Sequence, residues 1–148
     1  MVAERELVSD RLDRIRRYVG ELRGWAADTR DAFMQSRERQ YAVLHALQLA
    51  IEACIEVGTH ICAADALGTP ASYAETFDRL AQAGVLDEAL AGDLRAMARF
   101  RNRIVHLYWD VDMAEVHAIM TGRLQDFDRY LAAIERYLGP DDGGLSVG

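Results

Sequence analysis

The segment from Arg101 to Tyr108 concentrates the side chains of this chain that are best suited to chemistry on phosphates. It reads Arg-Asn-Arg-Ile-Val-His-Leu-Tyr and contains the only asparagine of the sequence. An arginine keeps its charge at physiological pH and can bind a phosphate with two hydrogen bonds, whereas a histidine side chain can exchange a proton near neutrality. Phosphodiester cleavage without a metal needs groups of these two kinds. The segment therefore predicts a metal-free cleavage site.

The chemistry of such cleavage gives each of these residues an expected role. The ribose 2′-hydroxyl attacks the adjacent phosphorus, which calls for a base, an acid and a cation on the phosphate oxygens. We expect Arg101 to be the cation, His106 to act as base or acid, and Asn102 to orient the phosphate or a base edge through its amide. One histidine cannot comfortably be base and acid in the same turnover. A second His106 from a twofold-related subunit is therefore expected to complete the site.

A helical wheel separates a core face of this segment from a polar face. The polar face carries a row of side chains that recur at helical spacing, namely Arg95, Arg99, Asn102 and His106. Such a row has two interpretations, an RNA-binding surface or a solvated face whose arginines pair with acids of neighbouring helices. The spacing of Arg101 and His106 alone is close to chance. The added Asn102 and Tyr108 reduce the chance expectation to roughly one in a thousand.

Helical periodicity covers almost the whole chain, which has only two prolines, Pro70 and Pro140. Ser72 and Asp112 are predicted to cap helices. The expected helices span roughly residues 5–27, 35–66, 72–84 and 87–108, followed by one long last helix from about 112 to 138. The sequence thus predicts an all-α protein, an antiparallel four- to five-helix bundle. Residues 1–139 would form one domain, and residues 140–148 a disordered tail.

Composition narrows the possible functions. The net charge of −7 argues against a protein that coats nucleic acid generally, and all 17 basic residues are arginine. Cys54 and Cys62 are expected to be buried small hydrophobes rather than a disulfide or zinc ligands, and no metal or cofactor is predicted. No apolar run reaches membrane-spanning length and the N-terminus is too polar for a signal peptide, so we expect no membrane association and a cytoplasmic protein.

The motif resembles the Arg-x4-His-x-Tyr pattern of the HepT-like toxins, within the HEPN superfamily of small helical ribonuclease domains. The resemblance covers most of the chain, and the motif itself shows no departure from the pattern. It implies a metal-independent endoribonuclease that is the toxin of a toxin–antitoxin pair and a homodimer with two motifs in one cleft. It also implies a cognate antitoxin, a minimal nucleotidyltransferase of the MntA type, which transfers AMP to the motif tyrosine. Here that tyrosine is Tyr108.

Several alternatives stay open at this point. Tyr108 is interpreted as a switch, but it could instead be an aromatic residue that packs at the helix end. Asn102, Arg99 and Arg103 are the predicted substrate contacts, while Trp109 could stack on a base or pack at an interface. The remaining histidines are expected to be packed or at the surface. The alternative function is a catalytically inactive helical partner of a nucleotidyltransferase, or a nucleotide- or RNA-binding module.

Overall fold

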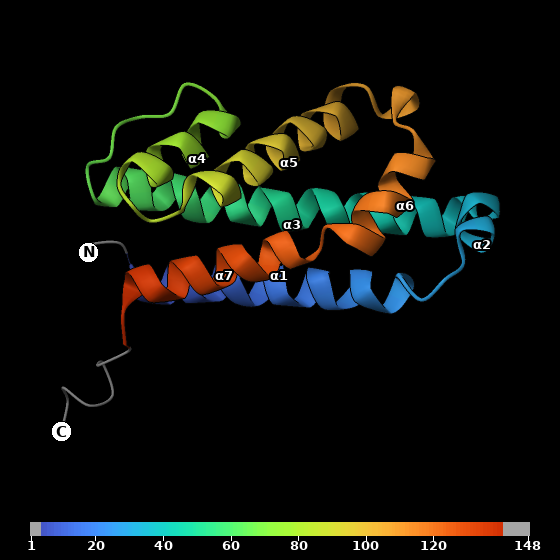
Figure 1. Ribbon diagram of the computed structural model, residues 1–148, viewed down its shortest axis with the longest axis horizontal. Coiled ribbons are helices and arrows are strands. Elements are labelled where there is room, and N and C mark those ends of the chain that lie inside the picture. Colours follow the sequence, from blue (N-terminus) through green and yellow to red (C-terminus); the bar gives the residue numbers. More distant parts are fainter. Residues whose placement is uncertain (1–3, 141–148) are drawn as a thin grey trace.

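The computed structural model describes residues 4–140, which form seven α-helices, one short 3-10 helix and no strand (Figure 1). The predicted all-α class is confirmed. The predicted tail lies outside the described residues, apart from Pro140. In chain order the elements are α1 (Arg5–Trp25), α2 (Arg30–Gln35), α3 (Arg37–Ala64), α4 (Tyr73–Gln82), α5 (Glu88–His106), η1 (Tyr108–Asp110), α6 (Met113–Gly122) and α7 (Gln125–Leu138).

Helix α3 is the centre of the bundle, because it packs against α1 on one side and against α4 and α5 on another. Along the chain α1, α3 and α5 alternate in direction, and α7 returns antiparallel to α1 (Figure 1). The start of α1 is joined to the end of α7, since Arg5 donates hydrogen bonds to the carbonyl oxygens of Leu138 at 2.6 Å and Gly139 at 3.3 Å. The far end of the bundle carries α2, α6 and the end of α5 (Figure 1).

The central position of α3 explains its unusually apolar composition. Over its most apolar stretch the mean hydropathy is 1.3, so by length and composition alone α3 could cross a membrane. This corrects the expectation that no segment of the chain reaches that length. In the fold 61% of that stretch is buried against the other helices. Burial in a protein core accounts for the apolar residues.

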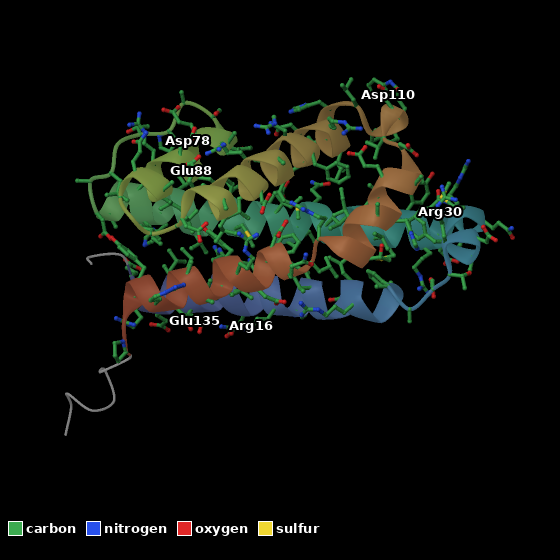
Figure 2. All side chains as sticks on the ribbon, viewed as in Figure 1. Arg16, Arg30, Asp78, Glu88, Asp110 and Glu135 are labelled. Carbon is green, nitrogen blue, oxygen red and sulfur yellow. The ribbon has the colours of Figure 1, made fainter. Side chains whose placement is uncertain are left out.

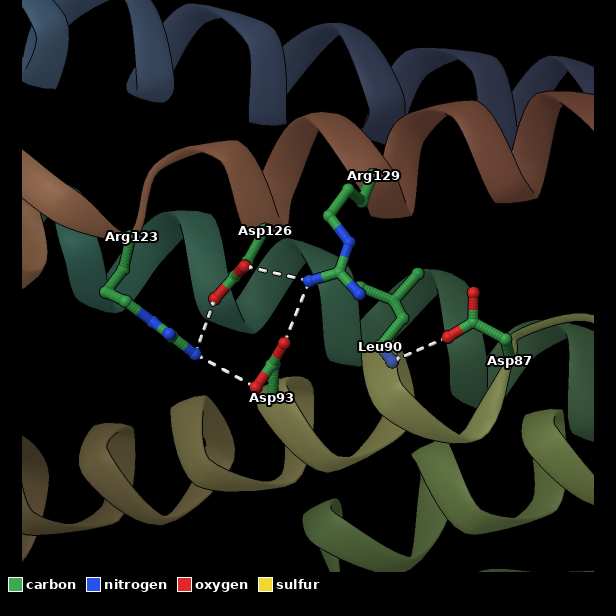
Figure 3. Close-up of polar contacts among 6 residues, drawn as sticks. All are labelled: Asp87, Leu90, Asp93, Arg123, Asp126 and Arg129. Atoms are coloured by element: carbon green, nitrogen blue, oxygen red, sulfur yellow. Dashed lines mark hydrogen bonds and ion pairs between the residues drawn. The ribbon is translucent and has the colours of Figure 1, made fainter.

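Side-chain caps define where the helices around the motif begin. The predicted caps are both confirmed, since Ser72 Oγ accepts the Glu75 N–H at 3.1 Å and Asp112 accepts the Ala114 N–H at 2.9 Å. The motif helix α5 has a cap of the same kind, in which Asp87 accepts the Leu90 N–H at 2.7 Å (Figure 3). The helices before and after the motif therefore have fixed starting points.

The predicted second helix is close to α3, but the short helix α2 that precedes it was not predicted. Thr29 caps α2, and Ser36 both ends α2 and caps α3 by accepting the Arg39 N–H at 3.1 Å. A six-residue helix offers too few turns for a periodic pattern. At its other end, α3 stops two residues earlier than predicted, where Ala66 takes a left-handed φ of 57°.

The prediction of one long last helix is wrong, because the chain breaks at Arg123 and Leu124 between α6 and α7. The apolar stripe continues without interruption across the break, which is why periodicity did not reveal it. The break is stabilised by ion pairs to Asp126, a carboxylate in the first turn of α7 that is only 1% exposed. Burial of a charged group requires such partners.

Two arginines and two aspartates form an ion-pair cluster at the break (Figure 3). Arg129 Nη1 lies 2.8 Å from Asp93 of α5 and 3.1 Å from Asp126, and Arg123 Nη2 lies 2.9 Å from Asp93. Arg123 is also 3.1 Å from the second oxygen of Asp126, an ion pair without the alignment of a hydrogen bond. Hydrogen bonds from Arg129 and Arg123 lower the pKa of Asp93. The cluster fastens α5 to the start of α7.

A glycine allows α3, α4 and α7 to approach closely. A Cβ atom on Gly58 would lie 2.7 Å from Thr76 Cγ2 and 3.3 Å from the Tyr130 hydroxyl. That hydroxyl donates a hydrogen bond to the Cys54 carbonyl oxygen at 2.8 Å. Cys54 and Cys62 are buried and free, as predicted, and burial raises the pKa of both thiols. The close approach seats α4 against the core beside the motif helix.

Candidate active site

The motif occupies the last turns of α5. Phe100 and Ile104 point into the core as predicted and fix the rotation of the helix, whereas Leu107, predicted on the same face, lies beyond the helix end and is 46% exposed. The helix ends at His106, and the Leu107 N–H closes the last turn on the Arg103 carbonyl oxygen at 2.8 Å. Tyr108 was predicted to be helical but lies beyond the end of α5, in the 3-10 turn η1.

Arg101 is the best-fixed polar residue of the motif. Its Nε donates a hydrogen bond of 2.9 Å to Glu52 Oε2 on α3, and its Nη2 lies 2.8 Å from the same oxygen. Its Nη1 donates to Asn102 Oδ1 at 3.1 Å, and its Cζ lies 5.0 Å from the centre of the Tyr73 ring. Only 14% of its side chain is exposed. The structure thus brings Arg101 and Asn102 together, as the motif predicts.

A cavity of about 530 Å³ gives access to Arg101 from solvent. Its wall includes Arg101, Glu52 and Tyr73, together with Arg11, Glu56 and His60. Glu52 and Tyr73 were not predicted, because they are far from the motif in sequence and lie on other helices. No local pattern could have identified them. A helical cavity wall that contains a fixed guanidinium can admit a phosphate group.

His106 lies at the exposed end of the motif helix. Within residues 4–140 it forms no hydrogen bond or ion pair, and none connects it to Arg101. A single chain therefore supplies one exposed motif histidine, not a pair.

The two aromatic residues after His106 are the most exposed of the motif region. Tyr108 is 62% exposed and Trp109 is 71% exposed, and their rings meet edge to face with centroids 5.6 Å apart. Neither ring packs in the core, and the alternative that Trp109 packs at an interface stays a prediction. Asp110 of the same turn projects from an outer corner of the molecule (Figure 2). A modifying enzyme can reach the Tyr108 hydroxyl at this corner.

The arginines of the polar row differ in their partners. Arg95 forms ion pairs with Asp78 of α4 at 2.6 Å and with Glu88, the first residue of α5, at 2.9 Å, and Figure 2 labels these acids on the two neighbouring helices. The salt-bridge alternative is therefore the correct one for Arg95. Arg99 is exposed and forms no hydrogen bond or ion pair with any residue in the part of the chain described. Arg99 is the basic residue of the row that is open to a new anion.

The other histidines lie in packed or surface positions, as predicted. His60 accepts a hydrogen bond from the Glu4 N–H at 3.1 Å, His117 lies against the Phe33 ring with centroids 5.4 Å apart, and His45 is exposed on α3. None of them contacts His106 through a hydrogen bond or ring contact within residues 4–140. His106 is thus the one histidine of the motif, and His60 lines the cavity that Arg101 also lines.

Comparison with known proteins identifies close relatives. A family model described as ribonuclease HepT-like matches residues 8–134. The tRNA nuclease HepT of Aphanizomenon flos-aquae is 30% identical over 132 residues, which cover 89% of this chain and 90% of the relative. The mRNA nuclease HepT of Shewanella oneidensis is 32% identical over 103 residues, which cover 70% of this chain and 77% of that protein.

A solved structure with the same fold is that of a tri-AMPylated Shewanella oneidensis HEPN toxin in complex with an MNT antitoxin. The TM-score is 0.82 at 27% identity, and the match covers 88% of this chain and 98% of the toxin. The predicted family resemblance is confirmed by fold and sequence together. The chain belongs to the HepT-like ribonuclease family.

Proposed function

We propose that this chain is a metal-independent endoribonuclease that acts as the toxin of a toxin–antitoxin pair and is inactivated by AMPylation of Tyr108. The ribonuclease HepT-like family and the two HepT nucleases confirm the prediction of an endoribonuclease at the family level. The AMPylated relative bound to its MNT antitoxin supports an MntA-type nucleotidyltransferase as the partner.

The proposal rests on the different environments of two motif residues of α5, Arg101 and His106. Arg101 is held rigidly in a cavity wall, while His106 stands free at the end of the same helix. Five residues of α-helix separate the two by about 7.5 Å along the axis and about 140° around it, so the two side chains of one chain face different directions. An oriented cation and a free proton carrier are the kinds of group that the attack of a 2′-hydroxyl on a phosphate needs.

The reaction needs no external co-reactant. The 2′-oxygen forms a bond to the phosphorus as its proton leaves to a base, and the bond from phosphorus to the 5′-oxygen breaks as that oxygen gains a proton from an acid. The products are a 2′,3′-cyclic phosphate and a 5′-hydroxyl. Arg101 binds the phosphate oxygens and stabilises the added negative charge, and His106 transfers a proton. Asn102, Arg99 and Arg103 contact the RNA near the cleaved bond.

The site is complete in a homodimer. Each chain offers one His106, which has no acid–base partner among the described residues. A twofold axis near the ends of the two α5 helices would bring two copies of His106 into one cleft, one as base and one as acid. The dimer is thus a requirement of the mechanism. We place the protein in the cytoplasm, where RNA and the antitoxin are available to it.

AMPylation switches the site off by charge and bulk. The Tyr108 oxygen attacks the α-phosphorus of a nucleoside triphosphate, the hydroxyl proton is lost, and diphosphate leaves. The resulting phosphodiester adds a negative charge and a nucleoside two residues from His106. An RNA phosphate approaching the same basic surface is then repelled and sterically blocked.

The first test measures RNA cleavage by the purified protein in the presence of a metal chelator. We expect cleavage by the wild type and by His45→Ala, which changes an exposed histidine on another helix, and a loss of at least about 100-fold for His106→Ala. RNA with a 2′-deoxy sugar at the cleavage position should resist. Equal activity of His106→Ala and wild type would contradict the mechanism. A wild type that accepts AMP but never cleaves RNA would support the inactive partner instead.

The second test measures mass after co-expression with the antitoxin. The wild type should gain AMP units and lose nuclease activity. Tyr108→Phe should gain none, whereas Tyr41→Phe, which alters a comparably exposed tyrosine on α3, should behave as the wild type. A mass gain that survives in Tyr108→Phe would assign the modification to another residue.

A further inference from the structure

A carboxylate on α3 controls the position of the motif arginine. Glu52 Oε2 accepts the Arg101 Nε–H at 2.9 Å, lies 2.8 Å from Arg101 Nη2, and also accepts a hydrogen bond from Gln48 Nε2 at 3.1 Å. The side chains of Glu52 and Arg101 are 26% and 14% exposed, so the pair is partly shielded from water. A shielded pair with two contacts to one oxygen holds its geometry better than a surface ion pair.

The contacts of Arg101 fix the plane of its guanidinium group. Glu52 engages Nε and Nη2, Asn102 engages Nη1 at 3.1 Å, and the Tyr73 ring lies on one face, 5.0 Å from Cζ. The hydrogen bonds use the Nε–H and one N–H of Nη1, while Nη2 faces Glu52 as an ion pair, so one N–H of Nη1 and the outward N–H of Nη2 remain. Two N–H groups on neighbouring nitrogens suffice for a bidentate phosphate contact. The arrangement restricts the guanidinium group and leaves it able to bind.

We propose that Glu52 is a positioning residue of the ribonuclease site, which orients Arg101 towards the phosphate that it stabilises during cleavage. This inference rests on the proposed ribonuclease function. Glu52 does not touch RNA, and its negative charge weakens the attraction of Arg101 for phosphate in the ground state. Its benefit is realised in the transition state, where a misdirected guanidinium would stabilise the added charge poorly.

The test compares Glu52→Gln with the control Glu38→Gln in steady-state RNA cleavage. Glu38 lies exposed in the first turn of α3, outside the cavity wall, and does not contact Arg101. We expect kcat of Glu52→Gln to fall about 10- to 100-fold, while KM for RNA stays equal or falls, because the arginine keeps its charge and loses its orientation. Glu38→Gln should stay within about twofold of the wild type in both constants.

Two further variants, Arg101→Lys and its combination with Glu52→Gln, distinguish a loss of positioning from a change in folding. Arg101→Lys keeps the charge but cannot make the two contacts to Glu52, so its kcat should fall by a similar factor. In the double variant Glu52→Gln with Arg101→Lys, the loss in kcat should be close to that of Arg101→Lys alone, since both changes remove one interaction. Thermal unfolding and AMPylation of Tyr108 in each variant report whether the fold is intact.

The outcomes separate this inference from the proposed function. Wild-type kcat in Glu52→Gln, a raised kcat, or losses that multiply in the double variant would overturn the positioning role and leave the ribonuclease assignment intact. A wild type that does not cleave RNA would instead overturn the proposed function itself. The positioning role would be established if Glu52→Gln lowers kcat with an unchanged or lower KM and the control glutamate variant does not.

Discussion

Arg103 of α5 is clamped by Glu115 of α6 through two parallel hydrogen bonds, each 3.0 Å long. These bonds raise the pKa of Arg103, and its guanidinium also lies over the Phe100 ring at 5.6 Å. The pair ties the last turns of the motif helix to the helix that follows. An RNA contact by Arg103 would have to compete with Glu115, whereas Arg99 on the same helix has no such partner among the described residues. The two arginines are therefore not equivalent as phosphate ligands.

This difference predicts how RNA affinity depends on salt. Arg99→Gln should weaken RNA binding uniformly across sequences and reduce the slope of log K against log salt by about 0.7, the value expected for one phosphate contact on a single strand. Arg95→Gln is the matched control, because Arg95 already pairs with Asp78 and Glu88. Binding titrations with inactive His106→Ala protein at several salt concentrations measure both slopes. Equal slopes for the Arg99 variant and its parent would exclude this phosphate contact.

A second prediction concerns the close approach at Gly58. Gly58→Ala should lower the free energy of unfolding by about 1–3 kcal/mol, because the new methyl group would overlap Thr76 and crowd Tyr130. Gly20→Ala on α1 should have the opposite sign and gain up to about 1 kcal/mol, since no atom lies within 4 Å of its Cβ and alanine favours helix. Denaturant unfolding of the two variants measures the difference. A Gly58→Ala variant that is more stable than wild type would mean that helix propensity dominates at Gly58.

The ion-pair cluster predicts a stability difference that depends on pH. Arg129 and Arg123 hold the pKa of Asp93 below its usual value of 3.8, so its stabilising effect is present above that value and is lost as pH falls through the lower folded-state pKa. At pH 7, Asp93→Asn should therefore be less stable than wild type by about 1 kcal/mol.

The difference between wild type and Asp93→Asn should then shrink in acid. Unfolding measured from pH 7 to pH 2 tests this, with Asp13→Asn as a surface control, in which an exposed pair to Arg16 is lost. A difference that stays constant over this range would show that Asp93 acts by shape and not by charge.

If the active form is a dimer, mixing wild-type with His106→Ala chains should lower the activity by more than the fraction of variant chains. If both copies of His106 serve one cleft, an equal mixture of wild-type and His106→Ala chains should retain about a quarter of the activity after subunit exchange, the fraction of dimers with two intact chains. Independent sites would retain about half. Activity of refolded mixtures, calibrated against unmixed protein, distinguishes the two values. A result of one half would refute a shared pair of histidines.

The sequence predicted the parts of the site that are local. Arg101, Asn102 and His106 lie within two turns of one helix, so their order along the chain determines how they face, and the family pattern identified them. Ser72 and Asp112 were predictable for the same reason, because a cap acts within three residues. The catalytic or binding roles of all the predicted site residues stay predictions, although the structure shows how each is exposed or paired, namely Arg101, Asn102, His106, Arg99, Arg103 and Tyr108.

The parts that could not be predicted depend on contacts between helices. Glu52 meets Arg101 from a position 49 residues earlier, and no spacing rule connects them. Tyr108 falls outside α5 because the helix ends at His106, a boundary that periodicity places only to within a few residues. The break before α7 depends on Arg123 and Arg129, each of which pairs with Asp126, while the apolar stripe around it is unbroken. The spacing of apolar residues indicates which face of a helix is buried, but it does not indicate whether the helix is continuous.

The exposure of Tyr108 on η1 bears on how such a toxin could be controlled over time. The ring contributes nothing to the core, so adding or removing a nucleotide there changes the surface and leaves the packing of the bundle untouched. Both forms should then have the same folding stability and resist proteolysis equally. Under the proposed switch the cell would keep a stock of intact, dormant protein. Its activity would be set by the fraction of chains that carry AMP, without synthesis or degradation of the chain.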